Sequence, residues 1–441
     1  MDMLNVKING ISVSVPKGST ILDAARMAGV EIPTLCFMKD KNEIGACRIC
    51  VVEANEGRGF RIVTACVYPV SEGMEVLTNT EKIQKARRTT LELILSTHDK
   101  SCLSCVRSTN CELQKLCRDY GVDSTAFEGF KPVYEKDETT PHLVRDNNKC
   151  VLCRRCVAAC NEQYVGVIGA NNRGIDTAIG TPFEVGLANV PCISCGQCTV
   201  VCPTGALVEK DDTDKIWEAL ADPSKHVVVQ TAPSIRATLG ECFGMPIGTN
   251  VEGKMVSALR RLGFSDVMEV ALGADVTSQR EAAEFVERME RGDTFMTTSC
   301  CPAYVEAVRR HAPELLPHVS ETATPMHYTA EIARERHPDT VTVFIGPCVA
   351  KRQEGLHDDM VDYVLTFEEV GALFNARGIV VEECEEHELE RPSNEARGYA
   401  IAGGVSAAVE KLGAPQKTIV VGNPVRPEVF TKAKDRDAIR A

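Results

Sequence analysis

Cysteine is the residue type that stands out in this sequence, because 21 of its 441 residues carry a thiol. Many of these thiols have the C-x-x-C spacing, which lets neighbouring sulfurs face one metal centre. The sequence opens with MDMLNVKING instead of an apolar signal segment, and it has no apolar run of about 18 residues. We therefore expect a cytoplasmic protein with no membrane partner, whose thiols bind metal instead of forming disulfides. The net charge of -13 argues against a nucleic-acid partner.

The most regular cysteine pattern lies between residues 150 and 202, where CVLCRRCVAAC and CISCGQCTVVCP repeat one spacing. This is the repeat of a bacterial ferredoxin with two [4Fe-4S] clusters, in which each run gives three ligands to one cluster and its last cysteine to the other. The predicted ligands of one cluster are Cys150, Cys153, Cys156 and Cys202. Those of the other are Cys192, Cys195, Cys198 and Cys160.

A second group of thiols lies near the N-terminus and consists of Cys36, Cys47, Cys50 and Cys66. Four thiolates, two of them in a C-x-x-C turn, suit a [2Fe-2S] cluster. A structural zinc site is the alternative, because zinc sites also use C-x-x-C pairs.

The segment that follows adds a histidine to a third group of thiols, and the group is His98, Cys102, Cys105 and Cys111. A lone histidine is more often a satisfied core or surface residue than a ligand. Here three thiolates would leave one iron of a [4Fe-4S] cluster open, and an imidazole just upstream can close it. Cys117 falls outside the spacing and is interpreted as a buried thiol.

The elements that must position these residues change along the chain, and we expect a multidomain protein of the α+β and α/β classes. NVKINGISVSV predicts two strands joined by a hairpin turn at Asn9-Gly10, and STILDAARMAG predicts a helix that begins at Ser19 and stops at Gly29. The expected domains are a β-grasp [2Fe-2S] domain at 1–80, a one-histidine, three-cysteine [4Fe-4S] segment at 81–120, a two-[4Fe-4S] ferredoxin domain at 140–212 and an α/β domain at 225–441.

Four segments of the last domain each read as an apolar strand, a turn and a helix: HVVVQTAPSIRATLG, TFMTTSCCPAYVEAV, TVTVFIGPCVAKRQE and GYAIAGGVSAAVEKL. This pattern predicts a mostly parallel sheet, and ligands of such folds gather at the carboxyl ends of the strands. Cys300, Cys301 and Cys348 all fall at such ends. We therefore predict that these three thiols lie together and ligate metal.

Across almost its whole length the sequence resembles the catalytic subunit of a modular, electron-bifurcating [FeFe]-hydrogenase. The motifs APSIR, TSCCPAY, TPM, PCVAKRQE and AGGV follow that family's order, and the loop GACRIC resembles the first [2Fe-2S] domain of the same family and of complex I. The resemblance implies that Cys300 relays protons and that Cys301 and Cys348 ligate the [4Fe-4S] part of the catalytic cluster. It also implies that Lys351 contacts the diiron unit.

Two features depart from that family. Its third motif, a glutamate followed by two cysteines, has no counterpart in the tail GAPQKTIVVGNPVRPEVFTKAKDRDAIRA, and Gly346 stands where a methionine usually precedes PC. Without the bridging cysteine there is no attachment for a diiron unit, so we expect no hydrogenase activity. The three thiols of this domain hold either a retained fourth [4Fe-4S] cluster or no cluster. Candidates for the missing ligand are Cys242, Cys384 and His387.

Several clusters in one chain suit stepwise one-electron transfer, and the sequence has no G-x-G-x-x-G or P-loop motif for a nucleotide. We therefore expect no catalytic residue in this chain and an electron-transfer role in a larger oxidoreductase. The truncated hydrogenase-like subunit of Stn-type, or NfnABC-type, electron-bifurcating transhydrogenases is similar to it. That resemblance implies as partners an NADH- and FMN-binding iron–sulfur flavoprotein, a small [2Fe-2S] subunit or an NADPH- and FAD-binding subunit, and ferredoxin.

Three other functions stay open from the sequence. The first is a true [FeFe]-hydrogenase whose missing ligands come from elsewhere, and the second is the electron-transfer subunit of a bifurcating formate dehydrogenase. The third is a redox sensor, against which stands the lack of a recognisable signalling domain.

Overall fold

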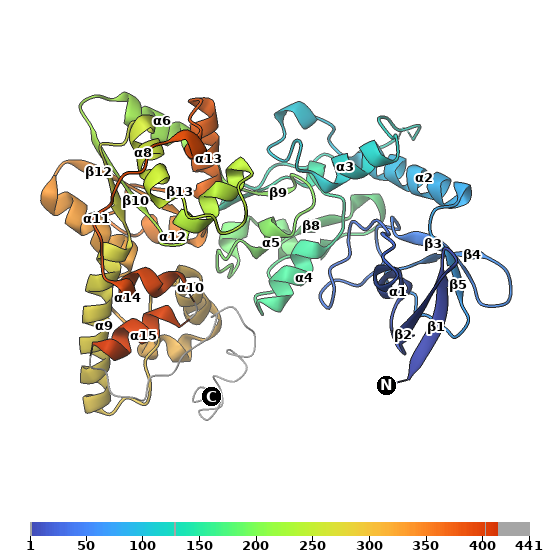
Figure 1. The fold of residues 1–441 in the computed structure, drawn as a ribbon, viewed down its shortest axis with the longest axis horizontal. Coiled ribbons are helices and arrows are strands. Elements are labelled where there is room, and N and C mark those ends of the chain that lie inside the picture. The colour runs from blue at the N-terminus through green and yellow to red at the C-terminus, as the bar shows by residue number, and fades with distance from the viewer. Residues whose placement is uncertain (1, 128, 402, 413–441) are drawn as a thin grey trace. The chain divides into compact units, whose positions relative to one another are not determined.

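The computed structural model describes residues 2–127, 129–401 and 403–412. The chain divides into two compact units, whose elements are labelled in Figure 1. Unit 1 comprises Met1–Val190 and Gln197–Val208, and unit 2 comprises Pro191–Gly196 and Glu209–Ala441. Unit 1 is α+β and unit 2 is α/β, which confirms the predicted fold class. No helix within the described ranges is both long and apolar enough to cross a membrane.

Unit 1 opens with a five-stranded mixed sheet in the order β2-β1-β5-β3-β4. The strands are β1 (Met3–Ile8), β2 (Ile11–Pro16), β3 (Val51–Asn55), β4 (Arg61–Thr64) and β5 (Glu75–Leu77). β1 pairs antiparallel with β2 and parallel with β5. The predicted hairpin is confirmed, because Asn9 and Gly10 join β1 to β2 with φ angles of 49° and 84°, as the tight left-handed turn requires.

Helix α1 (Ile21–Met27) packs its buried face into the core of this sheet. Its start corrects the sequence prediction, because the cap is Thr20 and not Ser19. The Thr20 hydroxyl accepts a bond from the Asp23 N–H, and the Asp23 carboxylate accepts one from the Thr20 N–H, so both ends of a capping box are present. The Ser19 N–H is already used by the Pro16 carbonyl in the preceding turn.

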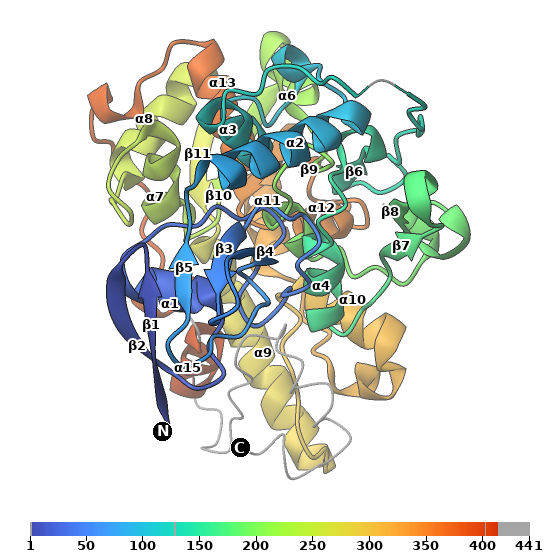
Figure 2. The ribbon, with the colours of Figure 1, turned by 90° about the vertical axis from the view of Figure 1, so that its right-hand side faces the viewer.

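The rest of unit 1 consists of short elements set around the cysteines. They include α2 (Glu81–Thr97), α3 (Glu112–Asp119), β6 (Leu143–Arg145), α4 (Arg155–Glu162), β7 (Gly169–Asn171), β8 (Ala178–Gly180), α5 (Gln197–Val200) and β9 (Leu207–Glu209), which leads into unit 2. Helices α2 and α3 lie side by side in Figure 2. They bury Leu91 and Leu116 against Leu35 and Ile49, which flank the first group of cysteines.

Unit 2 is built on a four-stranded parallel sheet in the order β11-β10-β12-β13. The strands are β10 (His226–Thr231), β11 (Asp266–Glu269), β12 (Thr340–Gly346) and β13 (Tyr363–Thr366). The helices are α6 (Thr213–Ala221), α7 (Ile235–Thr238), α8 (Glu252–Leu262), α9 (Ala271–Arg291), α10 (Pro302–His311), α11 (Pro325–Arg336), α12 (Ala350–Gly355), α13 (Phe367–Ala376), α14 (Asn394–Arg397) and α15 (Gly404–Lys411). Helices α6, α8 and α13 cover one face, and α9 and α11 cover the other.

Two of the four predicted strands of unit 2 are wrong. Residues 294–299 make a single bridge, between Thr297 and Val319, and residues 398–400 form a 3-10 turn. The first segment contains the apolar pair Phe295 and Met296, but its backbone bonds to residues 318 and 320 outside the sheet. The sheet instead recruits β11 and β13, which at four residues each are too short to show a clear alternation.

The close contact between α9 and α11 depends on Gly273. A Cβ at this position would lie 2.2 Å from the Pro325 carbonyl oxygen and 2.7 Å from the Thr329 backbone nitrogen. We expect Gly273→Ala to lower the free energy of unfolding by about 1–3 kcal/mol, because backbone atoms cannot move aside cheaply. Urea unfolding measures this change. Gly398→Ala is the control, since its Cβ would meet no atom within 4 Å; equal stability losses in both variants would contradict the prediction.

Candidate metal centres

The four N-terminal cysteines come together in unit 1. Cys36, Cys50 and Cys66 are buried, and Cys47 is half-buried beside them. A hydrogen bond with Cys47 lowers the pKa of the Cys36 thiol to about 6 and raises the pKa of Cys47. The Cys50 thiol is bonded to Cys66 in the same way, and its pKa is also lowered. Cys36 and Cys50 therefore lose their protons more readily, whereas the pKa of Cys66, like that of Cys47, is raised. The grouping of the four thiols fits the predicted [2Fe-2S] site.

The first ferredoxin set also converges, because Cys150, Cys153, Cys156 and Cys202 line one cavity of unit 1. Burial raises the pKa of Cys150 to about 11 and that of Cys153 to about 12. Thiolates that are buried away from water need the positive charge of a metal beside them to be stable. The cavity therefore fits a [4Fe-4S] cluster.

The two ferredoxin runs repeat their backbone geometry as well as their sequence. Leu152 and Arg154 have φ angles of 53° and 61°, and the equivalent Ser194 and Gly196 have 58° and 71°. In each run the N–H that lies two residues after the first cysteine points to that cysteine's Sγ, at 3.4 Å. The second run thus forms the same loop. Its predicted ligands come from both units, so that ligand set stays a prediction.

His98 follows α2 directly and is buried. Its Nδ1 has no hydrogen-bond partner in the described structure, and burial lowers its pKa to about 4. The imidazole is therefore neutral at pH 7, as a metal ligand must be. Cys111 lies within electrostatic reach of Cys102 and Cys105, and burial raises its pKa. These features fit a [4Fe-4S] cluster with one histidine ligand.

Within the described ranges, no three His, Cys, Asp or Glu side chains lie close enough to hold one metal ion. The zinc alternative for the N-terminal cysteines therefore stays open beside the [2Fe-2S] prediction.

The three thiols of unit 2 lie near one another, although only Cys348 follows a strand of the sheet. Cys301 is within electrostatic reach of Cys348 and Lys351. Cys300 is also within electrostatic reach of Lys351. Burial raises the pKa of Cys300 to about 11. Lys351 bonds to Glu354 at 2.7 Å; burial opposes its charge, but Glu354 keeps its pKa raised.

The candidate fourth ligands of this site are engaged elsewhere. Cys384 is buried in the core shared with α8 and α13, and its thiol donates to the Val380 carbonyl. His387 bonds to Ser257, and Cys242 packs beside Gly371. These contacts give no support to a complete set of four ligands around Cys300, Cys301 and Cys348.

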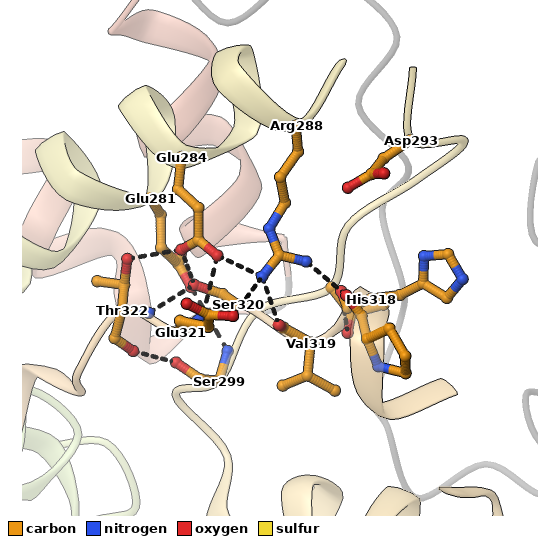
Figure 3. Close-up of polar contacts among 12 residues, drawn as sticks. Glu281, Glu284, Arg288, Asp293, Ser299, His318, Val319, Ser320, Glu321 and Thr322 are labelled. Carbon is orange, nitrogen blue, oxygen red and sulfur yellow. Dashed lines mark hydrogen bonds and ion pairs between the residues drawn. The ribbon is translucent and has the colours of Figure 1, made fainter. Parts of the chain in front are cut away.

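Figure 3 shows a cluster of polar contacts around Glu281, Glu284 and Arg288, which come from α9. Glu281 accepts a bond from the Thr298 hydroxyl at 2.7 Å, and the Cys300 N–H points to the same hydroxyl. Ser320 donates to Glu284 at 2.6 Å and also bonds to Glu281. Burial raises the pKa of Glu281, whereas hydrogen bonds and a neighbouring arginine overcome burial and lower the pKa of Glu284.

Arg288 completes this cluster on the side away from the thiols. Its guanidinium lies 2.6 Å from Glu284 and donates to the carbonyls of Pro317 and Val319. Two linked carboxyls with opposite pKa shifts can act as proton donor and acceptor. The sequence interpretation missed them, although Glu281, Glu284 and Arg288 stand at the i, i+3, i+7 spacing of one helix face.

A cavity of about 530 Å³ opens beside this polar cluster in unit 2. Ser299 and Ser320 line it, together with His327 and Glu354. Asp358 also lines it and bonds to His327 at 3.0 Å, which raises the pKa of that histidine. The cavity borders Ser299, the residue before Cys300, but its lining residues include none of the three thiols.

Comparison with known proteins agrees with this arrangement. The family described as iron only hydrogenase large subunit, C-terminal domain, matches residues 225–440. A 2Fe-2S iron-sulfur cluster binding domain matches 1–81, the NADH-ubiquinone oxidoreductase-G iron-sulfur binding region matches 87–126, and a 4Fe-4S dicluster domain matches 149–206. The NADP-reducing hydrogenase subunit HndD of Solidesulfovibrio fructosivorans is 39% identical over 93% of this chain and 74% of its own length. The chain belongs to the iron-only hydrogenase family.

Two further relatives of this hydrogenase-family chain match different lengths of it. Iron hydrogenase 1 of Clostridium pasteurianum is 34% identical over 92% of the chain and 74% of its own length. The NADPH-Fe(3+) oxidoreductase subunit alpha of Geobacter sulfurreducens is 38% identical, but over only 47% of the chain and 24% of its own length. The chain thus contains 2Fe-2S and 4Fe-4S cluster-binding domains, and its relatives are oxidoreductases or their subunits.

Removal of one cysteine from the first ferredoxin set tests that site. Cys153→Ala should lower the iron content by about four atoms per chain, because a [4Fe-4S] cluster with three ligands is labile. Iron analysis of anaerobically purified chain measures this loss. Cys117→Ala is the control, since this buried thiol lies outside the predicted ligand sets; an equal loss in the control would refute the assignment.

Replacement of Glu281 tests the buried carboxyl. Its folded-state pKa is raised, so the wild type should lose stability as pH rises from about pH 4 through that pKa. Glu281→Gln cannot ionise and should therefore gain stability relative to wild type between about pH 4 and pH 8. Thermal unfolding across this range measures the difference. A stability difference that does not change with pH would count against a raised pKa.

Proposed function

We propose that this chain is the iron–sulfur electron-transfer subunit of a flavin-based electron-bifurcating complex in the cytoplasm. The chain passes electrons between ferredoxin and the flavin subunits, which use NADH or NADPH. The whole complex would be an NADH-dependent reduced ferredoxin:NADP+ oxidoreductase. The observation that carries the proposal is the convergence of three predicted cluster sites on one apolar core of unit 1. Cys47, Cys111 and Val151, each in or beside a different site, all pack against this core.

The proposed cofactors are one [2Fe-2S] cluster and three [4Fe-4S] clusters, which supply one-electron transfer. The residues of this chain hold them in place and keep water away. The proposed ligands are Cys36, Cys47, Cys50 and Cys66; His98, Cys102, Cys105 and Cys111; Cys150, Cys153, Cys156 and Cys202; and Cys192, Cys195, Cys198 and Cys160. A fourth [4Fe-4S] cluster at Cys300, Cys301 and Cys348 is not part of the proposal, because the candidate fourth ligands Cys242, Cys384 and His387 have other contacts in the described part of the chain.

The lack of hydrogenase activity is part of the proposal, and Gly346 supports it. A Cβ here would lie 2.4 Å from the ring of Phe344, which is buried against Met326. The methionine usual in the family would therefore require the Phe344 ring to move. The expectation that the family's third motif has no counterpart concerns residues 413–441. These residues lie outside the described ranges, so the expectation stays a prediction.

A hydrogenase catalytic subunit is the second candidate. The polar cluster from Arg288 to Cys300 favours it, because a proton route to the thiol site is what hydrogen chemistry needs. Infrared spectroscopy of the native complex separates the two candidates. Carbon monoxide and cyanide bands together with hydrogen uptake would establish the second candidate and overturn the first.

Isolation of the native complex tests the proposed function directly. We expect the chain to co-purify with NADH- and NADPH-binding flavoproteins and the complex to reduce NADP+ only when NADH and reduced ferredoxin are both present. The measurement is the amount of NADPH formed under anaerobic conditions, determined separately from NADH. Each donor alone is the control. Co-purification with a molybdenum or tungsten protein would point to formate oxidation instead.

A further inference from the structure

Asn42 lies where two predicted cluster sites of unit 1 meet. Its side chain is buried, with 4% of the residue exposed. Its Nδ2 donates to the Cys36 carbonyl oxygen at 2.7 Å and to the Cys153 carbonyl oxygen at 3.0 Å. Cys36 belongs to the [2Fe-2S] set and Cys153 to the first ferredoxin set. One amide nitrogen therefore joins the ligand backbones of two different sites.

The local backbone holds Asn42 rigidly in this position. The Asn42 N–H bonds to the Met38 carbonyl at 2.8 Å, and the Met38 N–H bonds back to the Asn42 carbonyl at 3.1 Å. Asp40 turns the loop between them with a left-handed φ of 59°. Because the main chain is fixed on both sides, the side chain has little freedom other than to point into the seam between the two sites.

The chemistry of the seam calls for an amide in particular. Two backbone carbonyls that face each other need two donors, and the planar NH2 group of asparagine offers two N–H bonds from one atom. A hydroxyl can serve only one of these carbonyls, and an apolar side chain serves neither. A buried carbonyl left without its donor costs about 1–3 kcal/mol. The two sites are thus held together by a group that few residues can replace.

We propose that Asn42 is a positioning residue for electron transfer between the [2Fe-2S] site and the first [4Fe-4S] site. This proposal uses the cluster assignment of the proposed function, but not the identity of the partners. The bridge gives a continuous path from Cys36 Sγ along its own bonds to the carbonyl, across the Asn42 nitrogen, and through the Cys153 carbonyl to Cys153 Sγ. One electron moves from the reduced to the oxidised centre, and no proton or covalent bond changes place.

Such a bridge matters because electron tunnelling slows steeply as the gap widens, and more steeply through empty space than through bonds and hydrogen bonds. Asn42 acts on both factors. It fixes the separation of the two ligand backbones, and it replaces a through-space gap by two hydrogen bonds.

A neighbouring contact supplies a matched control. Lys41 adjoins Asn42 and forms an ion pair of 2.7 Å with Glu162 at the end of α4. This pair tethers the same loop to the same ferredoxin domain, but both side chains are substantially exposed. An exposed pair of this kind contributes only about 0–1 kcal/mol. Lys41→Met therefore removes a tether without removing the bridge.

The test compares the wild-type full chain, with its clusters assembled, with three variants of it. The variants are Asn42→Leu, Asn42→Ser and Lys41→Met. Iron content and the electron paramagnetic resonance signals of the single clusters establish that the sites are filled. The rate at which an electron injected by photoreduction equilibrates between the [2Fe-2S] and first [4Fe-4S] clusters is the decisive readout. A second readout is the magnetic interaction between these clusters when both are reduced.

We expect Asn42→Leu to slow this equilibration several-fold and to weaken the magnetic interaction, with iron content unchanged. Asn42→Ser should have a smaller effect in the same direction, and it carries the test alone if the leucine variant does not fold. Lys41→Met should behave as wild type. Unchanged rates in the Asn42 variants, or an equal slowing in Lys41→Met, would overturn the proposal. A failure to reduce NADP+ in the native complex would affect only the proposed function.

Discussion

A buried thiolate is stable only beside compensating positive charge, and unit 1 is organised around this constraint. Its cysteines are removed from water by apolar neighbours, and burial alone raises the pKa of Cys150 and Cys153. The protein offers these sulfurs backbone N–H groups, such as that of Leu152, and the positive charges of Arg145 and Arg155, but burial outweighs them. Metal binding must supply the rest, so the folding of this unit and the filling of its sites are coupled.

Unit 2 meets the same problem by pairing charges within the protein. Arg288 is held against Glu284, Lys351 against Glu354, and the buried Arg352 against Glu369 at 2.5 Å. Of these groups, Lys351 lies within electrostatic reach of Cys300 and Cys301, whereas Arg288 lies on the side away from the thiols.

The division fits the pattern of relatives. The NADPH-Fe(3+) oxidoreductase subunit shares only about half of the chain, whereas the hydrogenase relatives share nearly all of it. In unit 1 the sites are linked by short contacts, of which the Asn42 bridge and the core around Leu91 are the clearest. Such contacts suit a part that conducts electrons, because conduction depends on distance more than on the identity of the donor.

The sequence by itself determined the hairpin at Asn9-Gly10, and it predicted the cysteine sets of unit 1. Ligand spacing and turn chemistry act over a few residues, so they can be read without the fold. It missed β11 and β13 and placed strands at 294–299 and 398–400, because short strands are selected by their neighbours in the sheet. Only the tertiary structure brought Asn42 between Cys36 and Cys153, and Ser320 between Glu281 and Glu284. Apart from the local bond between Asn42 and Cys36, these contacts join residues far apart in the chain, so long-range packing decides which of these polar groups meet in the interior.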